Sequence, residues 1–300
     1  MTGQIPAVDA LGIPEADVGE SLWRGAFRRM RRRPMAIIGA IIMLLFVLVA
    51  LLAPVLAPYE PASTEWTELS TPYYVQGSSA DHPLGIDRYG SDMLTQLLYG
   101  ARQSLIIGVI ATSIGLIAGA LLGTLAGGLG GRVDTLIMRF VDILLSIPAL
   151  LLAISIAAAM GRNSFALMVA IGAAQVPIFA RLLRGSVLAQ RENDFVLAAR
   201  AVGVPKRQIL GAHILPNAIS PVIVQGTLSL ATAIIEVAGL GFLGLGPQDP
   251  STPEWGTMLA DVNRYLQTAP HLAIVISVLG FNLIGDGLRE ALDPKLRGRV

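Results

Sequence analysis

The chain has 300 residues, of which 53% are hydrophobic and only 14% are charged, and its net charge is +1. A soluble domain carries about 25% charged residues, so the composition excludes a soluble globular protein and predicts an all-α, polytopic membrane protein. The absence of cysteine excludes disulfides, thiol catalysis and cysteine-bound metals. The three histidines, His82, His213 and His271, lie far apart without ligand spacing, so no metal site is expected.

Residues 1–34 are predicted to form an N-terminal tail that ends in a cluster of six arginines between Arg24 and Arg33. The apolar run at 35–57 follows directly and is predicted to be the first transmembrane helix. A cleaved signal peptide is the alternative. The run is longer than a signal-peptide core and the tail before it is too long, so an uncleaved span is favoured.

Six transmembrane helices are predicted, because a bilayer core of about 30 Å needs about 20 apolar helical residues. The five that follow the first span lie at about 103–126, 139–160, 164–181, 217–240 and 270–288. Gln175 and Pro177 interrupt the fourth of these six spans, and the sixth needs the polar stretch around Asp286 to reach full length. The transmembrane core is therefore expected over 103–288, followed by a tail at 289–300.

The placement of Lys and Arg predicts the orientation of the chain. With six spans, 18 of the 22 basic residues fall on the side of the N-terminus and four on the other side. Since basic residues concentrate in cytoplasmic loops, both termini are predicted to be cytoplasmic and 58–102 to be extracytoplasmic. This segment and the Pro- and Gly-rich stretch at 242–269 are either partner surfaces or solvated connectors.

The second span carries a glycine every four residues, at Gly115, Gly119, Gly123 and Gly127. This spacing removes side-chain bulk from one helix face and lets another helix approach closely. The pattern predicts a packing seam, either within the chain or with a second subunit.

Three carboxylates lie within or beside the predicted spans. Asp142 and Asp286 fall near cytoplasmic ends, where water or a neighbouring arginine (Arg139 or Arg289) is available. Glu236 lies deeper, in the outer half of the fifth span. Because burying a carboxylate in lipid is costly, Glu236 either lines a pathway or holds helices together through a buried polar contact.

A polar, basic insert separates the fourth and fifth spans and is predicted to be a cytoplasmic loop at 182–216. The middle of this loop is predicted to form a short helix, a turn that ends it and a second helix. Asp194 is placed to cap a helix that begins at Phe195, and Ala198 and Ala199 give that helix a slim surface. Gly203 suits a helix C-terminus, Pro205 can start the next helix, and Pro216 marks the entry to the fifth span. Such an element either docks into a groove on a partner or lies on lipid headgroups.

This insert resembles the EAA loop of permease subunits in binding-protein-dependent ABC importers. Ala198, Ala199 and Gly203 match the first part of that pattern, and His213–Asn217 matches its end. Leu197 departs from it, since the family often has glutamate there, so the resemblance supplies no ion pair at this position.

Further stretches resemble the dipeptide/oligopeptide (DppC/OppC-type) subgroup of that family, and the match covers about 24–300. They lie at Arg28–Pro61, His82–Arg102, Phe242–Gly246 and Phe281–Pro294. The resemblance implies a type I ABC importer permease fold in the bacterial plasma (inner) membrane. It also implies a substrate such as a di- or oligopeptide, nickel or another solute.

The resemblance implies several partners. They are a homologous second permease (DppB/OppB-like), two cytoplasmic ATPase subunits (DppD/DppF- or OppD/OppF-like) that dock on the EAA loops, an extracytoplasmic solute-binding protein and membrane lipid. ATP and Mg²⁺ would belong to the ATPase subunits, and no cofactor or nucleic acid is expected for this chain.

The residues themselves support a non-enzymatic subunit. A phosphate-binding P-loop needs Gly-Lys-Ser/Thr, but Lys206 and Lys295, the two lysines, each follow a proline. The chain is therefore not the ATPase. An ion-coupled secondary transporter or channel acting alone is the alternative, with Glu236 as its only fair intramembrane candidate. A membrane enzyme ranks last because no catalytic constellation is present.

Overall fold

The computed structural model describes residues 34–262, apart from 72–73, 76–77, 88 and 250. This part of the chain is helical except for one two-stranded antiparallel hairpin, in which Ser70 pairs with Val75 and Thr71 with Tyr74. The elements are α2 (Pro34–Leu56), η2 (Thr67–Leu69), β1 (Ser70–Thr71), β2 (Tyr74–Val75), α3 (Met93–Leu129), α4 (Gly131–Ser146), α5 (Ala149–Met160), α6 (Ser164–Arg191), α7 (Asp194–Ala201), α8 (Lys206–Gln208), the π-helical turn η3 (Ile209–Ile214), α9 (Leu215–Ala218), α10 (Ser220–Phe242) and α11 (Trp255–Val262).

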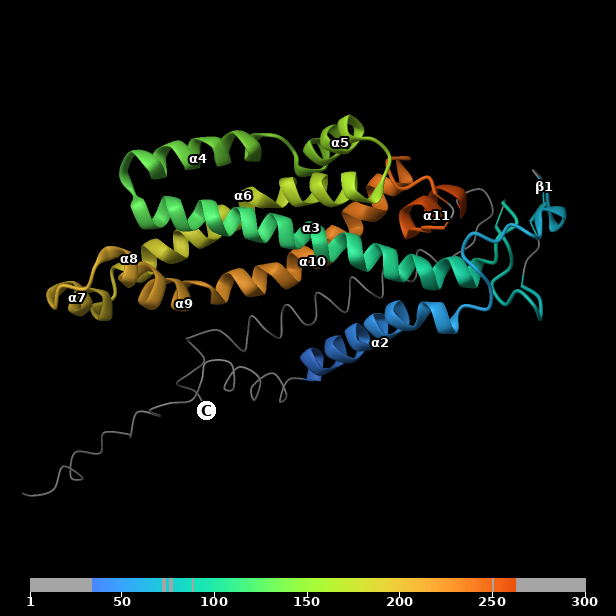
Figure 1. The fold of residues 1–300 in the computed structure, drawn as a ribbon, viewed down its shortest axis with the longest axis horizontal. Coiled ribbons are helices and arrows are strands. Elements are labelled where there is room, and N and C mark those ends of the chain that lie inside the picture. The colour runs from blue at the N-terminus through green and yellow to red at the C-terminus, as the bar shows by residue number, and fades with distance from the viewer. Residues whose placement is uncertain (1–33, 72–73, 76–77, 88, 250, 263–300) are drawn as a thin grey trace, which may run out of the picture.

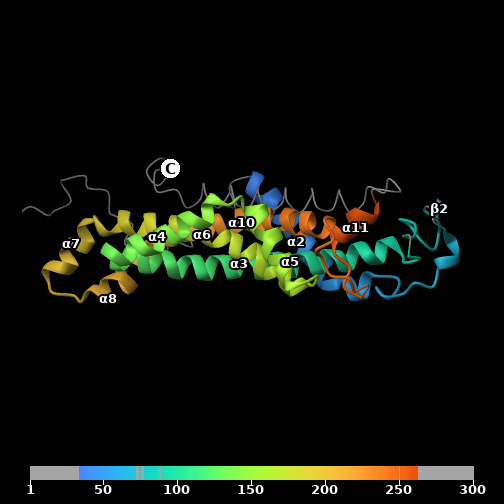
Figure 2. The same ribbon diagram turned by 90° about the horizontal axis from the view of Figure 1, so that it is seen from above.

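Four of these helices, α2, α3, α6 and α10, are long and apolar enough to cross a membrane. The pair α4 and α5 makes a fifth candidate, in which the two helices meet at an angle of 90°. The predicted sixth span, at 270–288, lies outside the described residues. The helices form an elongated molecule, with α7 and α8 at one end and α11 and the hairpin at the other (Figure 1, Figure 2).

The centre of the molecule is the long parallel contact between α3 and α6. The four glycines that are spaced four residues apart on α3 all face α6 within this chain. A methyl group built on Gly119 would lie 2.6 Å from both Cβ of Phe179 and the carbonyl oxygen of Val176. The two backbones are therefore so close that no side chain fits between them, which is how small residues drive helix packing in membranes.

Helix α3 begins ten residues earlier than the predicted span. Asp92 caps it, since its Oδ2 accepts a hydrogen bond from the backbone N–H of Thr95 at 2.8 Å. The first turns of α3 are buried by α11, whose Trp255 lies against Gly100. The segment predicted to be extracytoplasmic, 58–102, thus contains the first three turns of a membrane helix, because packing against α11 stabilises turns that hydropathy alone does not mark.

The span predicted at 139–160 is interrupted and is not one straight helix. Helix α4 starts at Gly131 and ends at Ser146, and α5 starts at Ala149. Pro148 disfavours helical geometry in the residue before it, and Ile147 is extended, with φ −94° and ψ 129°. The break turns the chain by 90°, so two helices stand where one was predicted.

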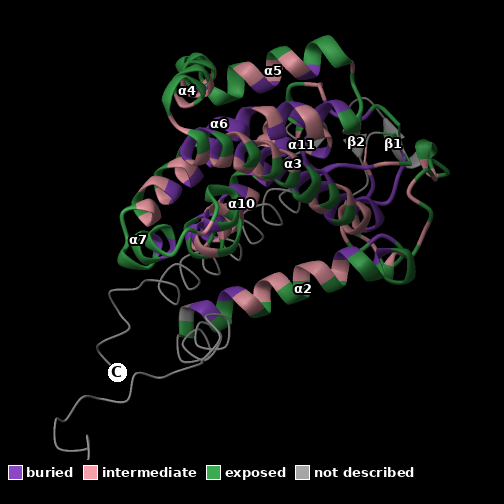
Figure 3. Ribbon diagram, turned by 60° about the vertical axis from the view of Figure 1, so that its left-hand side comes forward, coloured by how far each residue is buried: buried purple, intermediate pink, exposed green. Residues whose placement is uncertain are grey.

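Helix α2 covers one side of the bundle through a narrow face. Its alanines Ala50 and Ala53 are buried, and Phe46 packs on Trp255 with ring centroids 5.3 Å apart. Large apolar side chains such as Leu51 and Val55 are exposed. Figure 3 shows exposed and intermediate residues along most of α2. A helix that is apolar on every side is expected to be surrounded by lipid or protein, in agreement with the predicted first span.

Candidate functional site

The end of the molecule formed by α7, α8, η3 and α9 (residues 194–218) is called the coupling arm here (Figure 1). Helix α7 rests on the bundle through Val196 and Ala199, which join a core with Phe179 and Leu183 of α6. Its other surface is exposed and mostly apolar. The exposed side chains include Phe195, Leu197, Ala198 and Val202.

Gly203 ends α7 with the left-handed backbone that its position in the sequence predicts. Its φ is +82°. Its N–H donates to the carbonyl of Arg200, and the N–H of Val204 donates to the carbonyl of Ala199, each at 3.0 Å. This hydrogen-bond pair is a Schellman motif, which satisfies the last carbonyls of the helix. The turn is therefore a defined structure that holds the exposed tip of α7 in place.

Two details of the coupling arm differ from prediction. Asn193, and not Asp194, is the N-cap residue of α7, and neither side chain accepts a capping hydrogen bond. Asp194 is instead the first helical residue, where its charge still favours the positive end of the helix dipole. Pro205 is the N-cap of α8 and not its first residue. The short α8 continues through a π-helical turn into α9, whose first turn contains Pro216.

Leu197 occupies the position where the resembled pattern often has glutamate. Its side chain is 50% exposed and points away from the core that Val196 and Ala199 enter. The leucine is therefore outside this core, and a contact through its exposed half would be apolar instead of ionic.

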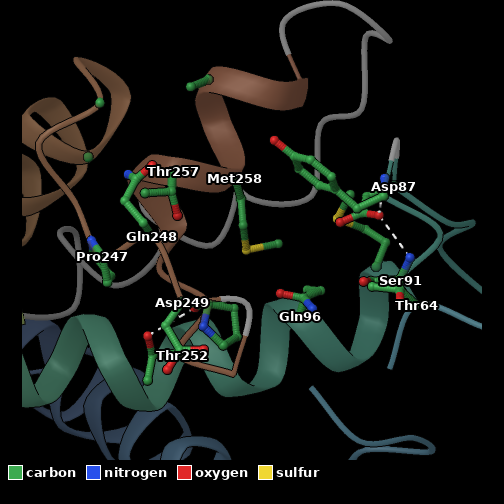
Figure 4. A pocket seen from close by; sticks show the side chains of 16 residues that line it. Thr64, Asp87, Ser91, Gln96, Pro247, Gln248, Asp249, Thr252, Thr257 and Met258 are labelled. Atoms are coloured by element: carbon green, nitrogen blue, oxygen red, sulfur yellow. Dashed lines mark hydrogen bonds between the residues drawn. The ribbon is translucent and has the colours of Figure 1, made fainter. Parts of the chain in front are cut away.

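The opposite end of the molecule contains a cavity of about 390 Å³. Asp87 and Ser91 line one side of it, Gln248 and Thr257 line the other, and Gln96 of α3 lies between them (Figure 4). Its charged lining residues within the described chain are both acidic, Asp87 and Asp249. Hydrogen bonds from Ser251 hold the pKa of Asp249 below its ordinary value, so this carboxylate is ionised at neutral pH.

Glu254 anchors one wall of this cavity and was not singled out from the sequence. Its side chain is completely buried and accepts hydrogen bonds from the N–H of Gly256 at 2.7 Å, the N–H of Thr257 at 3.1 Å and the hydroxyl of Ser104 at 3.3 Å. It thereby caps α11 and ties it to α3. Next to it, Nε1 of Trp255 donates to the carbonyl of Leu97 at 3.0 Å.

A second buried group joins the segment between α2 and α3 to the start of α3. Nδ1 of His82 lies 3.0 Å from Oδ1 of Asp92, and both side chains are almost fully buried. The His82 ring packs on Trp66, with centroids 4.6 Å apart, and Trp66 packs on Tyr59 at 4.5 Å. Asp92 thus caps α3 and also holds His82, so the segment between α2 and α3 is fixed to the bundle at this point.

The carboxylates within the spans have different surroundings. Glu236 is half-buried on α10, and its buried Oε2 has no hydrogen-bond partner within the described residues. Asp142 bonds to Arg181 of α6 at 2.7 Å, so the expected partner Arg139 is not the one used. Among the described residues no group of three or more His, Asp or Glu side chains could hold a metal ion.

The membrane-spanning helices, the seam between α3 and α6 and the protruding coupling arm define the class of protein: the transmembrane permease subunit of an ABC importer. Residues 119–298 match the family described as binding-protein-dependent transport system inner membrane component. Residues 21–72 match the N-terminal TM domain of oligopeptide transport permease C. The chain belongs to this permease family and is therefore an inner-membrane protein.

Individual relatives agree with this assignment. The dipeptide transport system permease protein DppC of Alkalihalophilus pseudofirmus is 46% identical over 92% of this chain and 91% of its own. The di/tripeptide permease DppC of Pseudomonas aeruginosa is 46% identical over 86% and 88%. The glutathione permease GsiD of Escherichia coli is 40% identical over 97% of both chains.

A solved structure supports the fold independently. The inward-facing MetNI methionine ABC transporter aligns with a TM-score of 0.57 at 20% identity, over 67% of this chain and 98% of that chain. A permease of this family works with a second permease, ATPase subunits and a solute-binding protein.

Proposed function

We propose that this chain carries di- or oligopeptides, or a closely related solute, across the membrane. It would do so together with a homologous second permease of the DppB/OppB type. The support comes from the relatives, because those most similar in sequence are permeases for dipeptides, tripeptides and glutathione. Both termini and the coupling arm would face the cytoplasm, as the distribution of basic residues indicates. The cavity beside α11 would face the solute-binding protein.

The proposed mechanism depends on α7, which has one side buried against the bundle and an exposed, apolar surface at its tip. Two ATPase subunits of the DppD/DppF or OppD/OppF type would receive this tip in a surface groove. ATP and Mg²⁺ would be bound by those subunits, and this chain would have no catalytic site of its own. Closure of the ATPases on ATP would move α7, and hydrolysis would return it.

Movement of α7 would reach the membrane through two routes. Val196 and Ala199 join it to α6, while α8, η3 and α9 lead directly into α10. Glu236 lies on α10, so we propose that it lines the pathway that this movement opens. The buried Oε2 of Glu236 has no hydrogen-bond partner among the described residues, and water in a pathway would supply one where lipid could not.

Replacing Gly203 by valine should leave the transporter assembled but uncouple ATP hydrolysis from uptake. Nothing lies within 4 Å of a Cβ added at Gly203, so the substitution creates backbone strain and no clash. A β-branched residue is strained in this left-handed conformation, by at least about 1–2 kcal/mol. The strain shifts the tip of α7. The measurement compares peptide uptake with ATPase activity in proteoliposomes.

The matched control is Gly203→Asn, because asparagine tolerates the left-handed conformation. It should retain most of the coupling that valine loses. Equal uptake per ATP hydrolysed in the two variants and in the unaltered protein would show that the turn at Gly203 does not transmit the movement.

The proposed substrate is tested with the complete transporter in proteoliposomes. The solute-binding protein loaded with a dipeptide should stimulate ATP hydrolysis and drive uptake of that dipeptide. Uptake of another solute class, with no response to any peptide, would overturn the peptide assignment and leave the permease assignment intact.

A further inference from the structure

The break between α4 and α5 lies at membrane depth on the surface of this chain. Helix α4 runs alongside α3 from its far end (Figure 1), and its 16 residues span about 24 Å at about 1.5 Å per residue. The break therefore falls within a bilayer core of about 30 Å. Residues 145–151 are all exposed in this chain.

Non-helical backbone at this depth is not compatible with lipid, because its free N–H and C=O groups find no partner there. It is tolerated where other protein covers it or where it borders water. Since the break at Ile147 and Pro148 is exposed among the described residues, either further protein or a water-filled space must lie against it.

The charged residues on the same surface indicate that water, and not further protein, lies against the break. Arg181 of α6 and Asp142 of α4 form an ion pair, and their side chains remain 57% and 55% exposed. A charged group at the centre of a membrane helix is unfavourable even on the most permissive scales. A protein surface that excludes water would need matching polar groups for the remaining donors and acceptors of the pair, whereas water supplies these hydrogen bonds itself.

Helix α4 also has two distinct exposed faces. Thr135, Arg139, Asp142 and Ser146 follow one another at spacings of four, three and four residues, which places them on one side of the helix; they are called the polar stripe here. The hydroxyls of Thr135 and Ser146 donate to carbonyls of their own helix, so the two charged members carry the argument.

The neighbouring side of α4, turned by about 100° from the polar stripe, is apolar and also exposed. Leu136 is 73% exposed, Phe140 52% and Ile143 63%. This face suits lipid, so α4 separates an apolar environment from a polar one. Beside the polar stripe, an open groove of about 650 Å³ continues over α6 and reaches Pro221 of α10. Its lining includes Pro177, Arg181 and Gly185.

We infer that the polar stripe of α4, together with Arg181, forms a wall of the water-filled pathway, and that the Arg181–Asp142 pair contacts the charged ends of the passing peptide. The inference rests on the proposed peptide transport. A guanidinium has five N–H donors, and a single hydrogen bond joins it to Asp142 in the structure. The pair therefore still presents one cationic and one anionic group to a zwitterionic ligand. The carboxylate of a peptide can accept two parallel hydrogen bonds from a guanidinium.

The chain has no cysteine, so single cysteines report directly on the surroundings of α4. Thr135→Cys and Ser146→Cys test the polar stripe, and Leu136→Cys and Phe140→Cys are the matched controls on the apolar face. The probe is a charged methanethiosulfonate added to the complete transporter in nanodiscs, with labelling of this chain followed by mass spectrometry. Because the thiolate reacts and forms only in contact with water, the stripe cysteines should be labelled at least about tenfold faster than their controls.

Peptide-loaded solute-binding protein and ATP should slow the labelling of Ser146→Cys while they leave Phe140→Cys unchanged. Equal labelling of the two faces, or labelling of the apolar face alone, would overturn the inference. Failure of the unaltered transporter to move any peptide would instead remove the proposed function, and the labelling contrast would still show whether α4 borders water.

Arg181 is tested through a comparison of ligands. Arg181→Gln should reduce the preference for a dipeptide over its C-terminal amide by about tenfold, as expected for loss of a charge-assisted hydrogen bond. Arg181→Lys keeps the charge and should lose less. The readout is the ratio of uptake rates with the same solute-binding protein. An unchanged ratio in Arg181→Gln would show that the pair does not contact the carboxylate.

Discussion

Replacing Gly119 by leucine is expected to prevent assembly of the permease. The added Cβ alone would lie 2.6 Å from both Cβ of Phe179 and the carbonyl oxygen of Val176, so part of the clash is with backbone. Overpacking with flexible neighbours costs about 1–3 kcal/mol, and a clash with backbone at the centre of the α3–α6 seam should exceed that range. The measurement is the yield of the assembled complex after solubilisation in a mild detergent.

Alanine substitutions give the matched control for this prediction. Gly119→Ala should reduce thermal stability strongly, whereas Gly239→Ala should be tolerated, because nothing lies within 4 Å of a Cβ at Gly239 of α10. Normal assembly of Gly119→Leu would mean that α3 and α6 can separate in the native complex, contrary to the contact described here.

Replacing Glu254 by leucine is expected to release α11 from the outer end of the bundle. The substitution removes the acceptor for the N–H groups of Gly256 and Thr257 in a fully buried site. Each buried donor left without a partner costs about 1–3 kcal/mol. Hydrogen–deuterium exchange of 255–262 in the complete complex should rise sharply, and the wall of the outer cavity should be lost with it.

The pH dependence of this contact provides a second measurement. Burial raises the pKa of Glu254 to about 7, although hydrogen bonds from Gly256, Thr257 and Ser104 oppose the shift. A carboxyl whose pKa is higher in the folded state contributes most stability below its ordinary pKa of 4.5, and this contribution is lost as pH rises through about 7. Attachment of α11 should therefore weaken between pH 5 and pH 8.

Glu254→Gln is the control, since the amide retains one oxygen acceptor but does not titrate. The protection of α11, taken relative to the intrinsic amide exchange rate at each pH, should be lower in this variant than in the unaltered protein at pH 5 but should not depend on pH between 5 and 8. The same pH dependence in Glu254→Gln would show that another group is responsible.

The seam between α3 and α6 also connects the two ends of the helical bundle mechanically. The N-terminal end of α6 is joined to α3 by a hydrogen bond of 2.7 Å between Gln103 and Ser164, and its C-terminal end leads into α7. Near the C-terminal end, Arg184 bonds to Asp134 of α4 through Nη2 and Oδ2 at 2.8 Å. A force on the coupling arm would thus be transmitted along stiff helices.

Much of this architecture could be predicted from local patterns. The apolar run before Ala57 coincides with α2, and the glycine spacing on α3 marks a close helix contact because backbone approach needs small residues at every fourth position. The turn at Gly203 was predictable because glycine followed by proline is typical of a helix end with left-handed geometry.

Other features depend on side chains that are far apart in the sequence. Hydropathy averages over a segment, so it merged α4 and α5 across Pro148 and did not include the first turns of α3. It also could not show that Asp142 pairs with Arg181, 39 residues further along the chain. In the sequence, Glu254 stands between a proline and a tryptophan, which suits the start of a helix. Nothing in the neighbouring residues indicated that its side chain would be buried.

The sequence by itself therefore determined the membrane class, the approximate spans, the coupling arm and the permease family. These follow from composition, periodicity and short motifs, which act over a few turns of helix. The tertiary structure alone decided which helix fills the glycine seam, where α4 and α5 bend apart, and which carboxylates are paired, buried or exposed. The physical reason is that burial and pairing are set by contacts between distant segments, and these exist only once the helices have packed.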